Sequence, residues 1–291
     1  MPVLGHYQYS SAHAGLQTHT HPKAVEICYL ERGYQTYRAA GREYKLVGGD
    51  VFVTAPGEPH DTGGHPEDRG VLYWLNLRIP KPGRSLLMLP AVESALLTAR
   101  LCGLPERQFA GRPVLKQIFN AVFGLYDQPA NAFRRLALAN QLVRCFLEVI
   151  DCAFRHEVMH CSPLIAKIVD RVKSYPELDY SLADLAQEAG LSLSRFKTKF
   201  KAQMGIAPRE FILRCKVEAA KALLANGRRN VTDTAMHLGF SSSQYFATVF
   251  KRFTQQTPVE FYIKGPVTPL RPGRVQPRPV ILRGLQSSRY V

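Results

Sequence analysis

One pattern occurs twice in the C-terminal part of the 291-residue chain, at 182–200 and again at 231–250. Asp184 and Gly190 of the first copy have identical counterparts 49 positions later, and Phe196 has its counterpart 50 positions later. The single extra residue therefore falls in the turn that follows the glycine, where an insertion disturbs packing least. Internal repetition of this kind indicates that the chain builds one supersecondary unit twice.

Each copy has the sequence signals of two short helices joined by a tight turn. In the first copy, Ser181 can cap the first helix, with Asp184 three positions later completing a capping box. Gly190 suits the left-handed residue that ends this helix. Ser192 then caps the second helix. The residues expected to face inward on that second helix are Leu193, Phe196 and Phe200.

The outer face of the second helix in each copy is basic and rich in hydroxyl groups, which suits the major groove of DNA. The residues expected to read bases are Ser194, Arg195, Lys197 and Thr198 in the first copy, and Ser243, Gln244 and Thr248 in the second. Helix N-termini and nearby lysines are expected to contact phosphates. These residues are Ser192, Ser241, Ser242, Lys201 and Lys251.

Residues 208–226 predict one helix of about 17 residues, roughly 25 Å long at 1.5 Å per residue. This helix would hold the two units at a fixed separation. With the bodies of the units added, the spacing suits successive major grooves, which lie about 34 Å apart on one face of DNA.

The net charge of +15 is concentrated in the C-terminal half of the chain. Residues 1–161 carry +3, residues 162–263 carry +6, and residues 264–291 carry +6. This asymmetry favours a polyanion as the partner of the C-terminal half.

Residues from about 162 to 262 resemble the double helix-turn-helix DNA-binding domain of the AraC/XylS family of bacterial transcription regulators. The resemblance is closest in TDTAMHLGFSSSQYFATVFKRFTQQTPVEFY, which spans 232–262. It implies a sequence-specific transcription regulator that binds double-stranded DNA and has RNA polymerase as a further partner. It also implies control by a small molecule bound in the N-terminal domain.

Residues up to about 82 are predicted to form β-strands. Runs that alternate apolar and polar residues, such as 34–38 and 71–79, are separated by glycine-containing turns such as Gly48-Gly49. Many short strands at close spacing, with no helix between them, indicate a small barrel or double sheet.

Within this region the positions of His19, His21, Glu26 and His60 resemble the two motifs of the cupin barrel, the usual N-terminal domain of AraC-type sugar regulators. In metal-binding cupins the matching positions hold one divalent ion, a role that imidazole and carboxylate ligands suit. Three interpretations stay open: a metal site, a polar wall without a ligand, and polar contacts with a small molecule inside the barrel. We expect the third, without a metal or other cofactor.

Further ligand-binding candidates follow from strand alternation. Trp74 and Asn76 share one face of their strand. An indole can stack on the apolar face of a sugar ring while an amide bonds its hydroxyls, although an ordinary hydrophobic contact is equally compatible with Trp74. Arg38 lies on a predicted strand, and its side chain is expected to point partly into the barrel. The expected effector is therefore a carbohydrate, bound by His19, His21, Glu26, Arg38, His60, Trp74 and Asn76.

From 83 to 161 the apolar residues recur at the spacing of an α-helix. A near-heptad stripe is formed by Leu115, Ile118, Val122 and Leu125, and a longer helix is expected at about 131–156. In the family, helices in this position pack on the barrel and carry the dimer contact. We expect a homodimer formed through the 115–125 helix, although such a stripe also suits a simple core.

The expected architecture is thus α+β with two domains: a cupin-like barrel at 1–82 followed by helices at 83–161, and an all-α double helix-turn-helix domain at 162–263. Residues 264–291 form a basic tail rich in proline and arginine, in which no regular structure is expected.

The compartment follows from two observations. No apolar run approaches the ~20 residues of a membrane helix. The six cysteines are scattered without a C-x-x-C pair, which is typical of reduced thiols in a cytoplasmic protein.

A different class of function stays open beside the regulator. A metal-dependent cupin enzyme fused to a DNA-binding domain would need the His19, His21, Glu26 and His60 set to hold an ion with an open coordination position. Neither a phosphate-binding glycine loop nor a nucleophile motif is present, so we expect no enzymatic activity.

Overall fold

The computed structural model describes residues 2–155, 162–227, 229–264 and 280–281. The predicted tail lies almost wholly outside the described residues. Within it, Val280–Ile281 form strand β8, which pairs antiparallel with β1 (Val3–Tyr9). Among the described residues, no helix has both the length and the apolar character needed to span a membrane.

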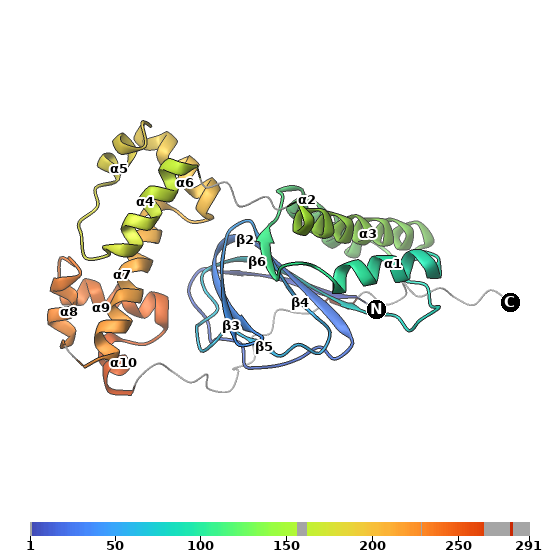
Figure 1. Ribbon diagram of the computed structural model, residues 1–291, viewed down its shortest axis with the longest axis horizontal. Helices are drawn as coiled ribbons and strands as arrows, with labels where there is room; N and C mark the ends of the chain where they lie inside the picture. Colours follow the sequence, from blue (N-terminus) through green and yellow to red (C-terminus); the bar gives the residue numbers. More distant parts are fainter. Residues whose placement is uncertain (1, 156–161, 228, 265–279, 282–291) are drawn as a thin grey trace.

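The N-terminal region is an antiparallel β-structure organised around one long strand (Figure 1). The strands after β1 are β2 (Ala24–Ala39), β3 (Arg42–Val47), β4 (Asp50–Thr54), β5 (His60–Asp61), β6 (Gly70–Arg78) and β7 (Gln108–Ala110). The first part of β2 pairs with β4 and β6, and its last part pairs with β3 and β5. Because β2 belongs to both groups of strands, the sheet curls around an interior.

A bulge in β2 allows this strand to serve both groups. The pairing with β6 shifts register between Leu30 and Arg32, and a bulge bends and twists the strand that carries it. Gly33 follows with φ +113°, and a Cβ there would lie 2.5 Å from the Arg69 carbonyl oxygen. Only glycine satisfies both the backbone conformation and the close approach.

The two faces of the sheet bury different residues. Val25, Ile27 and Tyr29 of β2 point to the helical side and belong to the largest hydrophobic cluster. Cys28 and Leu30 point to the interior, where they pack in a separate cluster with residues such as Phe52. The alternation predicted for 71–79 is confirmed, because Tyr73, Leu75 and Leu77 lie on the helical side and Trp74 packs in the interior.

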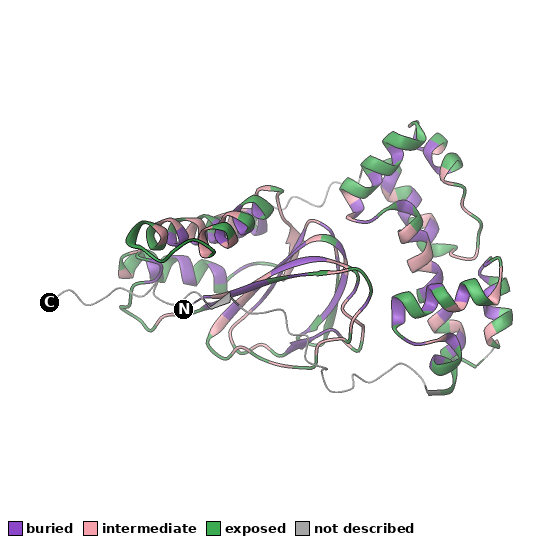
Figure 2. Cartoon of the chain, turned by 180° about the vertical axis from the view of Figure 1, so that it is seen from behind, coloured by how far each residue is buried: buried purple, intermediate pink, exposed green. Residues whose placement is uncertain are grey.

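Three helices cover the outer face of the sheet: α1 (Ala91–Cys102), α2 (Val114–Tyr126) and α3 (Ala132–Phe154) (Figures 1 and 2). Leu115, Ile118 and Val122 of α2 are fully buried against the strands and α3. The stripe predicted to carry a dimer contact is therefore part of the core of its own chain. The apolar outer face of the sheet is buried by α2 together with α1 and α3.

The C-terminal region is all-α, as predicted, and consists of two similar units joined by one helix (Figure 1). Its helices are α4 (Pro163–Ser174), α5 (Leu182–Glu188), α6 (Leu193–Met204), α7 (Pro208–Ala225), α8 (Val231–His237), α9 (Ser243–Thr254) and α10 (Pro258–Lys264). Phe211 and Ile212 of α7 pack in the first unit, while Val217, Ala220 and Leu224 pack in the second. Since α7 contributes to both cores, neither unit moves independently of it.

Most predicted helix signals of the first unit are confirmed. Ser181 caps α5, Ser192 caps α6, and Gly190 has φ +62°. Leu193 was predicted to face inward but is 39% exposed. Helical side chains lean toward the N-terminus, so the first residue of α6 projects past the packed part of the helix.

The N-terminus of α4 has a proline but no side-chain cap. Pro163 occupies the first turn, but the Ser162 hydroxyl makes no capping hydrogen bond. It lies 3.3 Å from the Gln203 amide oxygen, to which the Ser162 N–H also donates. A contact with α6 thus replaces the local cap.

The β-domain touches the first helical unit through close backbone packing. The Gly33 N–H donates to the Gly205 carbonyl at 3.4 Å, and Val47 packs against the core of the first unit. A Cβ on Gly205, whose φ is +68°, would lie 2.1 Å from the Gly48 nitrogen. Glycine at this position therefore allows the two domains to approach.

Candidate functional site

The second helix of each unit, α6 or α9, begins in the same way. The Ser192 hydroxyl accepts a hydrogen bond from the Arg195 N–H at 3.4 Å, and the Ser242 hydroxyl accepts one from the Tyr245 N–H at 3.1 Å. In both units a glycine in the left-handed conformation ends the preceding helix. The remaining N–H groups of each first turn are available to an anion, which the helix dipole also attracts.

The predicted DNA-contacting residues lie mainly at the surface of these two helices. In the first unit all of them are exposed: Ser192, Ser194, Arg195, Lys197, Thr198 and Lys201. In the second unit the exposed ones are Ser241, Gln244, Thr248 and Lys251, whereas Ser242 and Ser243 are half-buried. The inner face of each helix is fixed by two buried phenylalanines, at 196 and 200 in α6 and at 246 and 250 in α9.

The second unit presents fewer free donors than the first. The Thr248 hydroxyl donates to the Gln244 carbonyl within α9 at 3.0 Å. Arg252 is an exposed cation on the same helix, but its guanidinium is paired with Glu210 of α7 at 3.2 Å. Gln244 is exposed, which leaves its amide as the main candidate of this unit for the predicted contact with bases.

The interior of the β-domain contains polar groups without partners. Antiparallel pairing places Asn76 opposite Glu26 and Trp74 opposite Cys28, so these side chains share the inner face. The Asn76 amide oxygen is buried without a hydrogen-bond partner. The Trp74 ring covers Gly5 of β1, where a Cβ would lie 2.7 Å from it.

Sequence analysis missed one interior polar group. The Tyr7 hydroxyl is buried without a hydrogen-bond partner and lies in the same cluster as Tyr37 and Cys28. Burial raises the pKa of Tyr7 well above its usual value, so the phenol keeps its proton and can donate it. Tyr7 and Tyr9 are two residues apart and therefore share one face of β1. This pattern was the available signal, but it does not show which of the two tyrosines is buried.

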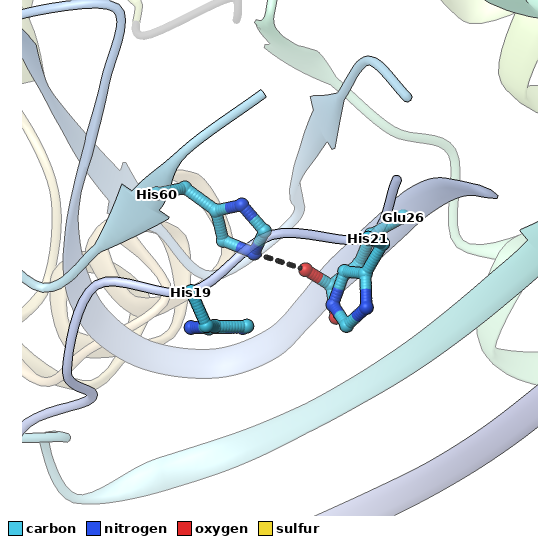
Figure 3. Close-up of side chains that lie close together, drawn as sticks. All are labelled: His19, His21, Glu26 and His60. Carbon is cyan, nitrogen blue, oxygen red and sulfur yellow. Dashed lines mark ion pairs between the residues drawn. The ribbon is translucent and has the colours of Figure 1, made fainter. Parts of the chain in front are cut away.

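Four predicted side chains converge at one end of the β-domain (Figure 3). His19 and His21 come from the segment before β2, Glu26 from β2, and His60 from β5. One potential ligand atom from each of the four residues lies within 4.8 Å of those from the others. Glu26 is 3.6 Å from His21 Nε2 and 2.7 Å from His60 Nε2.

Backbone hydrogen bonds hold these residues in place. His19 and His60 form a two-way bridge, in which each N–H donates to the other's carbonyl at 3.1 Å. The His21 carbonyl accepts from the N–H groups of Ala24 and Gly57. Gly57 has φ +77°. The turn before β5 is thus tied to the segment that carries the first two histidines.

Two of the imidazoles are also oriented through their ring nitrogens. His19 Nδ1 lies 2.9 Å from the Gln17 carbonyl, and His60 Nδ1 lies 2.9 Å from the Glu58 carbonyl. A carbonyl oxygen only accepts, so each Nδ1 carries the proton and donates. The lone pair of a neutral His19 ring is therefore on Nε2, whereas His60 Nε2 faces the Glu26 carboxylate.

The electrostatics of the cluster favour an ionised carboxylate. Burial raises the pKa of Glu26, but close polar contacts with His21 and His60 outweigh burial and bring this pKa to about 2. Burial lowers the pKa of His19. Burial also lowers the pKa of His60, but contact with Glu26 outweighs it, and the net shift is upward. A buried negative charge is thus surrounded by three imidazoles.

Arg38 does not join this cluster. It is exposed on β2, where its guanidinium makes two hydrogen bonds to Asp61 of β5, at 2.7 and 3.0 Å. The expectation that it points inward is wrong, because the neighbouring Tyr37 and Ala39 occupy the inward positions of the strand. Side chains of successive strand residues point to opposite faces.

Comparisons with known proteins cover both domains. A model of the AraC-like ligand-binding domain matches residues 2–143, and a model of a helix-turn-helix domain matches residues 185–262. The β-strands and helices α1 to α3 thus lie largely within one ligand-binding region.

Curated relatives match most of the length of the chain. The arabinose operon regulatory protein of Escherichia coli K12 is 26% identical over 236 residues, which are 79% of this chain and 77% of the relative. The transcriptional activator RhaS of Escherichia coli O157:H7 is 26% identical over 234 residues, which are 78% and 81% of the two chains.

Among solved structures, ToxT from Vibrio cholerae covers 92% of this chain and 96% of its own, with 14% identity and a TM-score of 0.34. Similarity of that size supports no argument about this chain. The two family models and the curated relatives are sufficient without it: the chain belongs to the AraC/XylS family of DNA-binding transcription regulators and has an AraC-like ligand-binding domain.

Proposed function

We propose that this protein binds specific DNA sequences through α6 and α9 and controls transcription in response to a carbohydrate bound inside the β-domain. The observation that carries the proposal is that α7 joins the two units, so that two exposed, N-capped helices are held on one framework. Two such helices suit two successive major grooves of one DNA duplex. In a bacterial host the regulator acts in the cytoplasm, with RNA polymerase as a partner.

A carbohydrate effector is supported by the interior of the β-domain. The Asn76 amide oxygen and the Tyr7 hydroxyl are buried polar atoms without partners, and leaving such groups unpaired costs about 1–3 kcal/mol each. Sugar hydroxyls supply both donors and acceptors, and the Trp74 ring offers a face for the apolar side of a pyranose. The arabinose operon regulatory protein among the relatives points to the same class of ligand.

The protein acts as a homodimer in this proposal. Because the stripe on α2 is buried, the contact must use another surface. The outward face of α3 carries Phe133, Leu136 and Leu147, all exposed. Exposed apolar side chains of this size on one helix are typical of a protein interface.

Selection of DNA ligands with the full-length chain tests the proposal. The chain is used to enrich a randomised duplex library, and binding of the enriched sequence is then measured with and without monosaccharides. We expect a bipartite site with two short motifs about one helical turn apart, and a change in affinity with one class of sugar. Enrichment of no sequence motif would contradict specific recognition, and indifference to every sugar would contradict the carbohydrate effector alone.

A further inference from the structure

We propose that the effector of this protein is a carbohydrate that carries a protonated amino group, and that Glu67 and Tyr7 hold this group. This assignment rests on the proposed function and narrows its ligand from carbohydrates in general to amino sugars.

The backbone around Glu67 is fixed by contacts on both sides. Glu67 lies between β5 and β6 and forms a two-way bridge with His13, with N–H to carbonyl distances of 2.7 and 3.0 Å. The next residue, Asp68, accepts from Arg214 of α7 through its carboxylate and donates its N–H to the Gln35 side chain. Neighbouring residues of an extended segment point to opposite sides. The Glu67 side chain therefore points away from α7 and toward the inside of the β-domain.

Two tyrosines of β1 lie beside this side chain. The rings of Tyr7 and Tyr9 stack with their centres 4.1 Å apart, and the Tyr9 ring centre lies 3.9 Å from that of His13. Burial raises the pKa of Tyr7, and it raises that of Tyr9 to about 12; in each case the charge of Glu67 is the next largest cause. Tyr7 is only 6% exposed, and its hydroxyl has no hydrogen-bond partner among the described residues. A buried, unsatisfied hydroxyl thus lies near a buried carboxyl.

The Glu67 carboxyl has no counter-charge. Within the part of the chain that the structure describes, it forms no hydrogen bond or ion pair with His13 or any other group, and burial raises its pKa to about 7. Glu26, by contrast, is paired with His21 and His60. All lysines and arginines of residues 2–82 are exposed: Lys23, Arg32, Arg38, Arg42, Lys45, Arg69, Arg78 and Lys81. A buried ionised carboxyl is costly without a paired cation, so a ligand must supply that cation.

An ammonium group suits these atoms better than a sugar hydroxyl does. It provides three donors and no acceptor, together with the positive charge that the Glu67 carboxylate needs. The unpaired atoms that face it are able to accept, because they are the carboxyl oxygens of Glu67 and the hydroxyl oxygen of Tyr7. A hydrogen bond between an ammonium and a carboxylate is also about twice as strong as one between neutral groups.

The Trp74 ring places the rest of the sugar next to this position. Gly5 of β1 pairs with Trp74, and Tyr7 is the next residue of β1 on the same face. Residues two positions apart on a strand are separated by about 7 Å, a distance that a pyranose ring and its exocyclic nitrogen can bridge. The apolar side of the ring would lie on Trp74, with the amino group between Tyr7 and Glu67.

Calorimetric titration of the full-length chain at neutral pH tests the ligand class. Each amino sugar is compared with its neutral counterpart: glucosamine with glucose, galactosamine with galactose, and mannosamine with mannose. We expect one amino sugar to bind about 10–100-fold more tightly than its counterpart, the range that hydrogen bonds to a charged group contribute. The N-acetylated form of that sugar, which has no charge, should lose this gain. Equal or tighter binding of the neutral member of every pair would overturn the amino-sugar assignment and leave the carbohydrate effector in place.

Two variants test the residues. Glu67→Gln removes the charge at nearly constant volume and should reduce the affinity for the amino sugar to that for its neutral counterpart. Tyr7→Phe removes only the hydroxyl and should weaken amino-sugar binding by a smaller factor. The control is Glu43→Gln, since the Glu43 side chain on β3 is 47% exposed, and this variant should bind the sugar as the unmodified chain does.

Circular dichroism of each variant establishes that the β-domain is folded. If Glu67→Gln does not fold, Tyr7→Phe and the paired sugars on the unmodified chain still decide the outcome. Undiminished preference for the amino sugar in a folded Glu67→Gln variant would overturn the role of Glu67.

Ethanolamine distinguishes failure of the amino-sugar assignment from failure of the proposed function. If ethanolamine binds as tightly as the best sugar, the cation contact at Glu67 remains and the carbohydrate effector is rejected. If neither ethanolamine nor any sugar binds, both are rejected. Preference for an amino sugar that leaves the affinity for the enriched DNA unchanged would support the ligand contact and reject the control of DNA binding by that ligand.

Discussion

The Arg214 guanidinium of α7 makes two hydrogen bonds, of 2.8 and 3.0 Å, to the Asp68 carboxylate of the β-domain. Both side chains are largely buried. The same guanidinium lies 4.2 Å from the ring centre of Tyr34 in β2 and 5.1 Å from that of Phe253 in α9. One side chain thus connects the ligand-binding domain to the second DNA-binding unit.

Asp68→Asn should weaken the docking of the two domains. The substitution keeps the shape of the side chain but leaves a buried guanidinium without its counter-charge, a loss that costs about 3–5 kcal/mol. We expect a larger radius of gyration by small-angle X-ray scattering. Arg155→Gln is the control, because its pair with Asp151 is largely exposed and contributes about 1 kcal/mol or less. Unchanged scattering from Asp68→Asn would show that the pair does not hold the domains together.

Gly205→Ala and Gly190→Ala separate backbone strain from domain packing. Both glycines have positive φ, so alanine costs about 1–2 kcal/mol at either position. A Cβ at Gly190 has nothing within 4 Å, whereas a Cβ at Gly205 would meet the Gly48 backbone at 2.1 Å. We therefore expect a similar fall in melting temperature but a change of domain arrangement only in Gly205→Ala. The same scattering profile for both variants would contradict the backbone contact.

Gln244→Ala and Lys251→Ala should affect DNA binding differently. A glutamine amide that bonds one adenine gives about 1–3 kcal/mol of discrimination, so its loss should relax preference at one base pair. A lysine that contacts phosphate carries no sequence information, so its loss should weaken binding to all sequences alike. The slope of log K against log salt concentration should also become smaller by about one. Both effects are measured by binding to single-base variants of the enriched site. An equal loss on every sequence for Gln244→Ala would rule out its assignment as a base reader.

Glu67 should make the protein less stable as pH rises. Burial raises the pKa of this carboxyl from 4.5 to about 7. The folded chain thus holds the proton more tightly than the unfolded chain, and this stabilisation is complete below pH 4.5 and is lost as the pH rises through about 7. Over this pH range the unfolding free energy should fall by up to about 3 kcal/mol.

The measurement for Glu67 is urea unfolding of the unmodified chain and of Glu67→Gln between pH 4.5 and 8. The difference in unfolding free energy between the two should change across this window, because glutamine does not titrate. Parallel pH profiles would show that Glu67 is not the group responsible.

The DNA-binding domain was the part of the fold that the sequence predicted best. Repetition of Gly190 and Phe196 in the second copy gave the order of the helices, and the same residues gave the exposed faces of α6 and α9. These features depend on neighbours within a few residues, which a sequence pattern records directly. The position of Trp74 on the inner face of β6 followed from strand alternation for the same reason.

Other features depend on partners far away in the chain. Residues 68 and 214 are 146 positions apart, and no periodicity links a strand residue with a helix residue at that separation. The stripe of Leu115 and Val122 has the same pattern whether it meets another chain or its own sheet. Arg38 was misplaced because alternation gives two faces but does not state which is inward.

The shared helix α7 has a consequence for how binding sites can change over time. It has 18 residues, and adding one turn of about 3.6 residues would lengthen it by about 5.4 Å and displace one unit along the groove. In the proposed mode of binding, substitutions on the surface of α6 or α9 change the bases preferred by one unit without affecting the other. Base preference can then change in one unit while α7 keeps the distance between the two motifs constant.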